Sequence, residues 1–181
     1  MTADVLTLST YKSTHLPQIR STLVDVYAEV WAKEAETDPF LSVERFDERL
    51  SGHASGGDWT CVVGEIGGDT VGYAYGRLDS VSEWHEVLDP TDPGAYDYGS
   101  DGTFGLCEIM VRAPWRGTGI ARGIHDELMR PRPEARASLL VDHERPRLRA
   151  LYERWGYHRV GEMQPYPDSP RYDAMVLPLP R

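Results

Sequence analysis

The sequence lacks the features that mark membrane, secreted and metal-binding proteins. No apolar run approaches the ~20 residues that a helix needs to span a bilayer, and residues 1–10 lack the basic region and apolar stretch of a secretion signal. The chain has only two cysteines, Cys61 and Cys107, and no His/Cys cluster with the spacing of metal ligands. We therefore expect a cytoplasmic protein with reduced cysteines, no metal and no membrane partner.

Positive charge is also scarce, and it is unevenly placed. The formal net charge of −10 argues against nucleic acid or an anionic membrane surface as a partner. Up to Cys107 the chain holds 19 acidic and 6 basic residues, and from Glu108 onward 10 acidic and 13 basic ones. Segment 79–101 holds seven acids and no Lys or Arg. A charge run is most often a solvated loop, but this asymmetry also suits a cationic substrate in one half and an anionic cofactor in the other.

The remaining pattern predicts one mixed α/β domain over residues 1–181. Apolar residues at helical spacing predict helices at 16–30, 43–50, 120–128 and 147–154, the first capped by Ser13 or Thr14. Runs rich in β-branched and aromatic residues predict strands at 5–8, 59–65, 70–77, 104–111, 137–141, 157–163 and 172–179. Segment 79–102 shows no periodicity, and long loops of this kind often form lids or binding segments.

The most informative stretch is the junction between the strand at 104–111 and the helix that follows. Pro114 ends the strand, and Gly117 and Gly119 allow the backbone unusual dihedral angles and a close approach to a ligand. The next helix presents unpaired N–H groups and the positive end of its dipole, and Arg116 can add a charge. These features predict a phosphate or pyrophosphate site. The turn is not a Walker motif, because Gly119 is followed by Ile120 rather than by Lys.

Two motifs together give this turn a family context. Val111, Pro114, Arg116, Gly119 and Ala121 match, in order and spacing, a strand ending in Val, then Pro, then an Arg/Gln-x-x-Gly-x-Gly/Ala turn. A second motif, Leu-Tyr-Glu-x-x-Gly-Phe/Tyr, is matched by Leu151-Tyr152-Glu153-Arg154-Trp155-Gly156-Tyr157. The chain therefore resembles the GNAT superfamily of acyl-CoA N-acyltransferases over nearly its whole length. The resemblance implies a mixed, mostly antiparallel twisted sheet of about seven strands flanked by about four helices.

The resemblance also implies where acetyl-CoA, as co-substrate, would bind. The turn residues would hold the pyrophosphate, namely Arg116, Gly117, Thr118, Gly119, Ile120 and Ala121. The backbone of Ile109, Met110 and Val111 would pair with the pantetheine arm and hold the oxyanion. An Asn is common in the family where this chain has Arg145, so Arg145, Arg147 or Arg149 could contact CoA phosphates instead. Homodimers are frequent in this superfamily, and the sequence leaves the oligomeric state open.

Two residues are the candidates for proton transfer. Glu108 shares a strand face with Phe104, Leu106 and Met110 if the strand alternates regularly, and a carboxyl there would lose hydration and gain a higher pKa, as a general base requires. A bulge pointing it to solvent or to an Arg partner is the alternative. The resemblance implies that Tyr152 protonates the leaving thiolate, and the alternative is a core tyrosine.

These observations predict an N-acetyltransferase that moves an acetyl group to a primary amine of a small cationic metabolite or peptide by direct attack. Candidate substrate-binding residues are Trp84, His85 and Tyr98, all within the acidic segment, although a surface role for His85 is the simpler interpretation. One alternative is a non-catalytic acyl-CoA-binding regulatory module. Another is an acetyltransferase that acts on protein lysines or N-termini.

Overall fold

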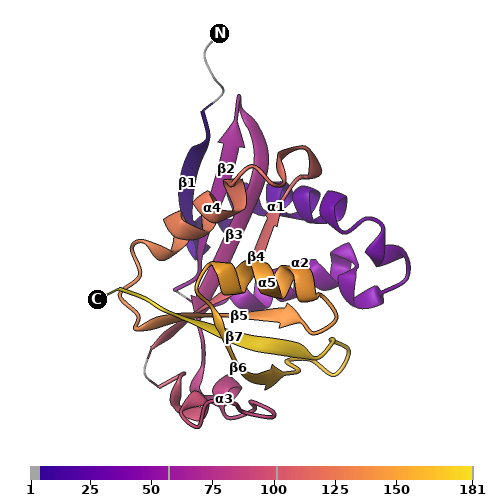
Figure 1. The fold of residues 1–181 in the computed structure, drawn as a ribbon. Coiled ribbons are helices and arrows are strands. Elements are labelled where there is room, and N and C mark those ends of the chain that lie inside the picture. The colour runs from indigo at the N-terminus through magenta and orange to yellow at the C-terminus, as the bar shows by residue number, and fades with distance from the viewer. Residues whose placement is uncertain (1–4, 57, 101, 181) are drawn as a thin grey trace. The chain divides into compact units, whose positions relative to one another are not determined.

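The computed structural model describes residues 5–56, 58–100 and 102–180 (Figure 1). Seven strands form a sheet in the order β1-β2-β3-β4-β5-β7-β6. Contacts divide the chain into two compact units: a first unit, Met1–Arg77 with Cys107–Pro131, and a second unit, Leu78–Leu106 with Arg132–Arg181. The predicted fold class is confirmed, with four helices of nine or more residues and one short helix in the described residues. That the two units act as one domain stays a prediction.

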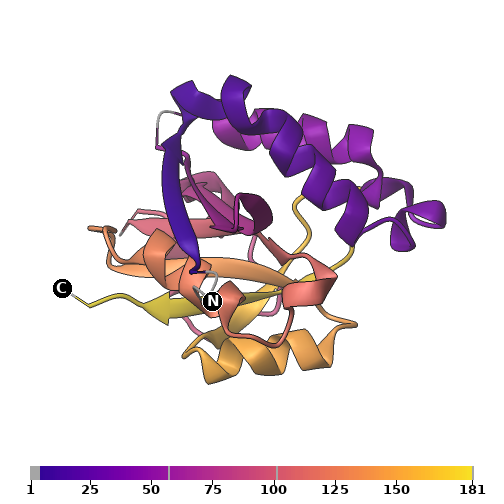
Figure 2. The same cartoon turned by 90° about the horizontal axis from the view of Figure 1, so that it is seen from above.

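The first unit places helices on both faces of its strands. Its complete elements are β1 (Thr7–Lys12), α1 (Leu16–Val30), α2 (Val43–Ala54), β2 (Thr60–Ile66) and α4 (Ile120–Met129). It also contains β3 (Asp69–Leu78) except its last residue, and the second half of β4 (Thr103–Val111). Helices α1 and α2 run side by side over one face (Figure 2), where the core includes Val63, Tyr73 and Tyr75. Helix α4 packs on the other face, against Gly64. Gly67 and Gly68 both have positive φ angles and form the β2–β3 turn, as predicted.

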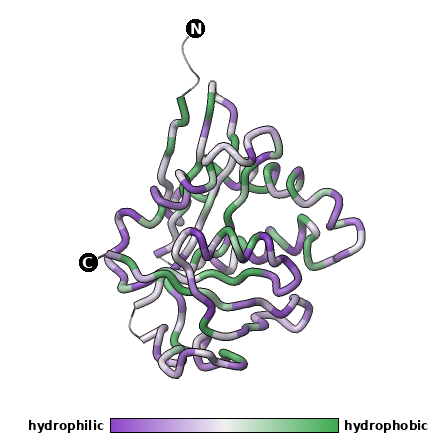
Figure 3. Tube along the Cα trace, viewed as in Figure 1, coloured by the Kyte–Doolittle hydropathy of each residue, from purple (hydrophilic) through white to green (hydrophobic). Residues whose placement is uncertain are grey.

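The second unit contains the one parallel strand pair among the described pairings. Its elements are α3 (Val81–Trp84), the first half of β4 (Thr103–Val111), β5 (Arg136–Asp142), α5 (Pro146–Arg154), β6 (His158–Met163) and β7 (Tyr172–Pro178). β4 and β5 are parallel from Thr103↔Arg136 to Leu106↔Leu139, whereas β7 pairs with β5 and β6 in antiparallel fashion. The hydropathy tube shows apolar stretches along strands and on parts of the helices (Figure 3).

The prediction of an irregular loop at 79–102 is wrong in part. Leu88 exchanges two backbone hydrogen bonds of 2.7 Å with Glu162 of β6, which anchors the middle of the segment. Trp84, Val87 and Ala95 are buried in a core cluster with Val160 of β6 and apolar residues of β7. The pattern failed to show this because the apolar residues are spread among turns instead of lying at one period. Asp101 lies outside the described residues.

Some boundaries also differ from the prediction. The strand predicted at 5–8 is displaced to Thr7–Lys12, and neither Ser13 nor Thr14 caps α1, because both lie in a 3₁₀ turn (Ser13–His15) before it. Helix α2 continues to Ala54 and is capped by Ser42, whose hydroxyl accepts from Arg45 N at 3.2 Å.

Candidate active site

Strand β4 carries one more residue than the neighbouring β3. Backbone hydrogen bonds join Asp79 N to Thr103 O at 2.9 Å and Arg112 N to Val71 O at 2.8 Å. Between these bonds the chain advances nine positions along β4 but eight along β3. The extra residue is a β-bulge, a feature that breaks alternation and redirects a side chain. Residues Cys107, Glu108 and Ile109 form a run of partly accessible positions inside an otherwise buried strand.

Glu108 lies among groups of the core that α1 and α2 cover. Its charge acts on three tyrosines of the first unit, namely Tyr27, Tyr73 and Tyr75. For each phenol, Glu108 is the charge with the largest influence on the pKa. The extra residue interrupts regular alternation along β4, while Met110 belongs to the same core cluster as Tyr73 and Tyr75.

This environment raises the pKa of Glu108 to about 7, because protein surrounds the carboxyl and disfavours its charged form. The charge of Arg49 opposes that rise. The side chain keeps some solvent-accessible surface, but dense protein surroundings decide the pKa. A carboxyl with this pKa exists in both protonation states near neutrality, which is the property of a general base.

Arg49 and the tyrosines form the fixed frame around this carboxyl. Arg49 is only 6% exposed, donates from Nη1 to Phe40 O at 2.8 Å and from Nη2 to the Tyr27 hydroxyl at 3.2 Å, and stacks over the Phe40 ring at 4.3 Å. Sequence reasoning missed Arg49 and the three tyrosines. An arginine inside an amphipathic helix usually faces solvent, so only the observed burial shows its role.

The predicted anion site has the expected backbone. Gly117 and Gly119 have φ angles of 74° and 87°, in the left-handed region that favours glycine. Gly119 is the N-cap of α4, and no side chain caps the helix. An added Cβ on either glycine would meet no atom within 4 Å, so the turn borders open space. Arg116 and Thr118 are exposed, while Ile120 is buried and anchors the helix. These open N–H groups at the start of a ten-residue helix fit a pyrophosphate.

The backbone expected to receive the pantetheine arm directly precedes this turn. Ile109 is partly accessible, and Met110 and Val111 are buried. The parallel ladder between β4 and β5 ends at Leu106, before these three residues. Their role in pairing with an acyl-CoA arm stays a prediction.

Tyr152 lies in the second unit, on α5. It is 6% exposed and packs edge-to-face on Trp155 and Tyr157, with centroids 5.5 Å and 6.0 Å away. Gly156, with a φ of 101°, ends the helix as predicted. This packing fixes the ring, and an acid role for the hydroxyl stays a prediction.

The basic residues of α5 are engaged to different degrees. Arg149 pairs with Glu153 at 3.0 Å and with Asp173 at 3.2 Å, and Arg145 lies 3.7 Å from Asp142. Arg147 is exposed at the start of the helix. Among the three arginines proposed for CoA phosphates, Arg147 is thus the one without an ion pair inside the described chain.

The three candidate substrate-binding residues do not share one environment. Trp84 is 2% exposed and donates from Nε1 to Asp79 Oδ2 at 3.1 Å. Tyr98 contacts the Trp84 ring at 5.2 Å, donates to Asp92 and lies under the Arg136 guanidinium at 4.1 Å. His85 is exposed. Trp84 and Tyr98 therefore stabilise the second unit, and their contact with a substrate stays a prediction.

Several acidic residues of segment 79–101 form hydrogen bonds that stabilise the fold. Asp79 accepts from Trp84 and Ser138, and Glu83 completes a capping box with Ser80. Asp92 accepts from Tyr98 and from Gly94 N, and these bonds lower its pKa. The exposed acids Glu86, Asp89 and Asp97 take no part in these bonds, although Asp89 lies 3.7 Å from the Arg159 guanidinium.

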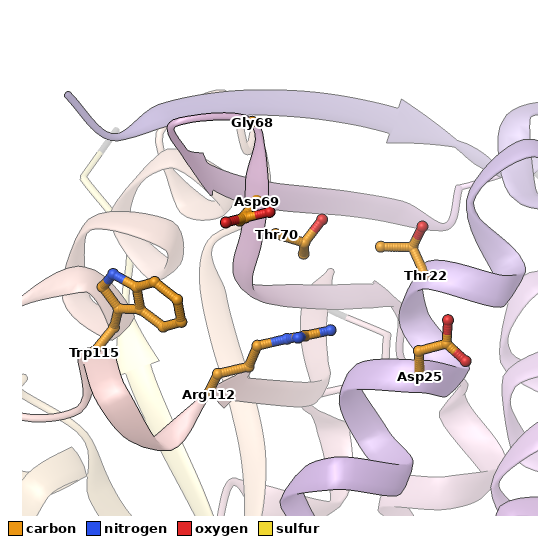
Figure 4. A pocket seen from close by; sticks show the side chains of 7 residues that line it. All are labelled: Thr22, Asp25, Gly68, Asp69, Thr70, Arg112 and Trp115. Carbon is orange, nitrogen blue, oxygen red and sulfur yellow. The ribbon is translucent and has the colours of Figure 1, made fainter. Parts of the chain in front are cut away.

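A polar pocket of about 380 Å³ lies in the first unit, beside the β2–β3 turn and Trp115 (Figure 4). Arg112 reaches into it between α1 and the β2–β3 turn, and its guanidinium pairs with Glu29 at 3.1 Å. The other lining residues are Thr22, Asp25, Gly68, Asp69, Thr70 and Trp115. Its lining is mainly polar and contains no candidate proton-transfer residue.

One group in the described part of the chain has the donor atoms of a metal site. His143, Glu162 and Asp173 present ligand atoms within 4.8 Å of one another. Arg159 pairs with both carboxylates, at 2.8 Å to Asp173 and 3.3 Å to Glu162, and Arg171 pairs with Glu162 at 2.8 Å. These arginines already compensate the carboxylates, so the group is an ion-pair network, and no metal is assigned to it.

The described site thus combines a carboxyl of raised pKa on β4 with an open, glycine-containing turn at the start of α4. The acetyltransferase (GNAT) family model matches residues 17–157. The chain belongs to this family. At the level of the family it is an acyl-CoA-dependent N-acetyltransferase. No curated protein matches the chain significantly.

Solved structures share the fold at low sequence identity. Ribosomal-protein-S18-alanine N-acetyltransferase from Escherichia coli is 18% identical, with a TM-score of 0.61 over 98% of this chain and 96% of that one. An acetyltransferase from Streptococcus agalactiae is 16% identical, with a TM-score of 0.64 over 96% and 98%. PaiA N-acetyltransferase from Thermoplasma acidophilum, in complex with coenzyme A, is 9% identical, with a TM-score of 0.57 over 96% and 99%. None of the described helices is long and apolar enough to cross a membrane.

Proposed function

We propose that this protein transfers an acetyl group from acetyl-CoA to a primary amine of a small cationic metabolite or peptide, by direct attack. The observation that carries the proposal is the Glu108 carboxyl. Its burial and its pKa of about 7 suit it to take a proton from the attacking amine at neutral pH. The family match supplies the acyl donor class.

Each step of this reaction has a candidate residue in the chain. Glu108 accepts the proton that the amine loses, directly or through one water. The backbone N–H groups of Gly119, Ile120 and Ala121 bind the pyrophosphate, and the open space around Gly117 allows it to approach. The Tyr152 hydroxyl donates the proton that the departing thiolate needs. Acetyl-CoA, when bound, supplies the thioester carbonyl.

The cationic nature of the acceptor rests on the exposed acids of segment 79–101. Neutralising Glu86, Asp89 and Asp97 together should lower kcat/KM for polyamine-like acceptors and leave neutral amines unaffected, because the attraction is electrostatic and screened by salt. Changing these three acids leaves the capping box and the Asp92–Tyr98 bond intact and removes one ion pair, between Asp89 and Arg159. A matched control changes the same number of exposed acids elsewhere in the second unit, at Glu144, Glu153 and Asp168. Equal losses in both triple variants would remove the argument for a cation.

A thiol-release assay tests the reaction itself. Acetyl-CoA is offered with a panel of mono-, di- and polyamines, amino acids and short peptides, and released CoA is measured between pH 5 and 9. An acetyltransferase should give thiol release that needs the amine and rises with pH through about 7, the pKa of Glu108. Binding of CoA by calorimetry with no thiol release from any amine would instead favour a regulatory acyl-CoA-binding module. Release with peptides alone would favour acetylation of protein lysines or N-termini.

A further inference from the structure

The polar pocket of the first unit brings side chains of both charges together (Figure 4). Arg112, directly after β4, reaches across it toward α1, which contributes Thr22 and Asp25. Asp69 and Thr70 line it from the start of β3. The volume of about 380 Å³ lies within the range of small-molecule sites. This cavity is therefore large enough for a small organic ligand that carries charge.

The guanidinium of Arg112 uses one of its edges and leaves another without a partner. Nη1 pairs with Oε2 of Glu29 at 3.1 Å. Nε is shielded from solvent and has no hydrogen-bond partner, and no group of the described chain bonds to Nη2. The N–H groups of Nε and Nη2 lie parallel in the plane of the guanidinium, which is the geometry that receives the two oxygens of a carboxylate. A ligand carboxylate that contacts Nη2 would therefore bring its second oxygen toward Nε.

Two acidic side chains of the pocket also lack partners. Asp25 and Asp69 are exposed, and neither carboxylate forms a hydrogen bond or an ion pair with any residue that the structure describes. A ligand with negative charge alone would be repelled by these two carboxylates, and one with positive charge alone by Arg112. A molecule with a carboxylate and an ammonium group suits the pocket, because each of its charges meets an opposite partner. The hydroxyls of Thr22 and Thr70 add neutral hydrogen-bonding groups.

We propose that this pocket binds a free amino acid. The carboxylate of the amino acid is held by the Nε and Nη2 donors of Arg112, and its ammonium group by Asp25 or Asp69. The Trp115 indole, on the side of the pocket opposite α1 in Figure 4, packs against the carbon atoms of the ligand. None of these residues is a candidate for proton transfer or for binding the pyrophosphate. The inference therefore goes beyond the proposed function and does not depend on it.

Calorimetry on the whole chain, without CoA, tests the class of ligand. The common free amino acids are titrated one by one at pH 7, and at least one should bind. For that probe, the matched amine without the carboxylate and the matched acid without the ammonium group should each bind at least about tenfold more weakly, because each lacks one set of charge-assisted hydrogen bonds. Absence of binding at millimolar concentrations, or equal binding of an analogue with one charge, would overturn the proposal.

Substitution of Arg112 tests the place of binding. Arg112→Lys should weaken the amino acid at least about tenfold, because a lysine keeps the charge beside Glu29 but cannot offer two parallel donors. Arg20→Lys, at an arginine of α1 that pairs with Asp47 outside this pocket, is the matched control. Glu108→Gln should bind the amino acid as wild type does, which separates the pocket from the proposed acceptor site. Unchanged affinity in Arg112→Lys, or lost affinity in Glu108→Gln, would overturn the proposal.

Single substitutions of the two acids identify the partner of the ammonium group. Asp25→Asn or Asp69→Asn should weaken the amino acid about tenfold without weakening the matched acid that lacks the ammonium group. Urea unfolding checks that both variants are folded, and wild-type affinity in both folded variants would overturn the proposal. A chain that releases no thiol with any amine, yet binds the amino acid through Arg112, would leave this inference in place while refuting the proposed reaction.

Discussion

Each unit contains a carboxyl surrounded by protein, and the pKa values of the two carboxyls are shifted in opposite directions. Glu108 in the first unit has its pKa raised to about 7 by burial, with Arg49 opposing. Asp173 in the second unit is 1% exposed, and its burial also acts to raise its pKa, but bonds from Arg159 and His143 and the charges of Arg149 and Arg159 lower it overall. The difference lies in the partners and not in burial alone.

This contrast separates a carboxyl available for chemistry from one that holds the fold. Asp173 joins β7 to β6 and α5 through Arg159 and Arg149, and it is ionised at every pH at which the protein would work. Glu108 has no such ion pair among the described residues, and its proton is free to exchange near neutrality. Four experiments challenge this contrast, from the largest expected effect to the smallest.

The first experiment removes the base and keeps its shape. Glu108→Gln should lower kcat/KM about 10²- to 10³-fold, within the range for a lost general base, and abolish the rise in activity through pH 7. Steady-state thiol release across pH 5–9 checks both effects. Tyr73→Phe, which removes a neighbouring hydroxyl but no titrating carboxyl, is the control. A Glu108→Gln enzyme that keeps its pH profile would place the base elsewhere.

The second experiment removes the structural carboxyl. Asp173→Asn should lower the free energy of unfolding by up to about 3 kcal/mol at pH 7, because it breaks the ion pairs of the buried carboxylate with Arg159 and Arg149, which keep only Glu162, Asp89 and Glu153 as partners. Urea unfolding measures it. The lowered pKa of Asp173 means that its stabilisation is present above about pH 4 and is lost as the pH falls through the native pKa. The two proteins should therefore converge in stability in acid, and activity per folded molecule should be unchanged.

The third experiment examines the same linkage with the opposite sign. Glu108 has a native pKa above the unfolded one, so its folded protonated form stabilises the protein below about pH 4.5, and that contribution is lost as the pH rises through 7. Glu108→Gln should therefore be more stable than wild type at pH 8.5, by at most about 3 kcal/mol. The advantage should vanish at pH 4. A Gln variant that is less stable at pH 8.5 would show that the ionised carboxyl has a compensating partner.

The fourth and smallest effect concerns the turn beside Glu108. Gly119→Ala should weaken CoA binding by several-fold, because a left-handed φ of 87° costs a non-glycine residue about 1 kcal/mol or more. Calorimetry with CoA measures the dissociation constant. Gly52→Ala on α2 is the matched control, because an added Cβ there also meets no atom within 4 Å but the residue lies in a helix, where Ala is favoured. Equal affinity for CoA in both variants would show that the turn does not bind the cofactor.

The sequence predicted those features that depend on local pattern. The apolar period of α1, the Gly67-Gly68 turn, and the glycines before α4 follow from neighbouring residues, and the structure has them where expected. Glu108 could be identified as the candidate base because it is an acidic residue within the apolar run that predicts the strand at 104–111.

Features that depend on pairing between distant segments were missed or misread. The bulge in β4 exists only relative to β3, so alternation within β4 alone could not reveal it. Trp84 is buried because segment 79–101 pairs with β6, some seventy residues further along. Arg49 on α2 gained its role from Tyr27 on α1, which no spacing within α2 reveals.

The number of reactive cysteine thiols should distinguish folded from unfolded molecules of this protein. Cys61 is buried in the first core, and burial raises the pKa of its thiol well above the ordinary value, so it stays unreactive while that core is closed. Cys107, beside Glu108 on β4, is partly accessible. A thiol-specific dye should label one site per native chain and two per unfolded chain. The same stoichiometry, read with and without CoA, would report whether the ligand shields strand β4.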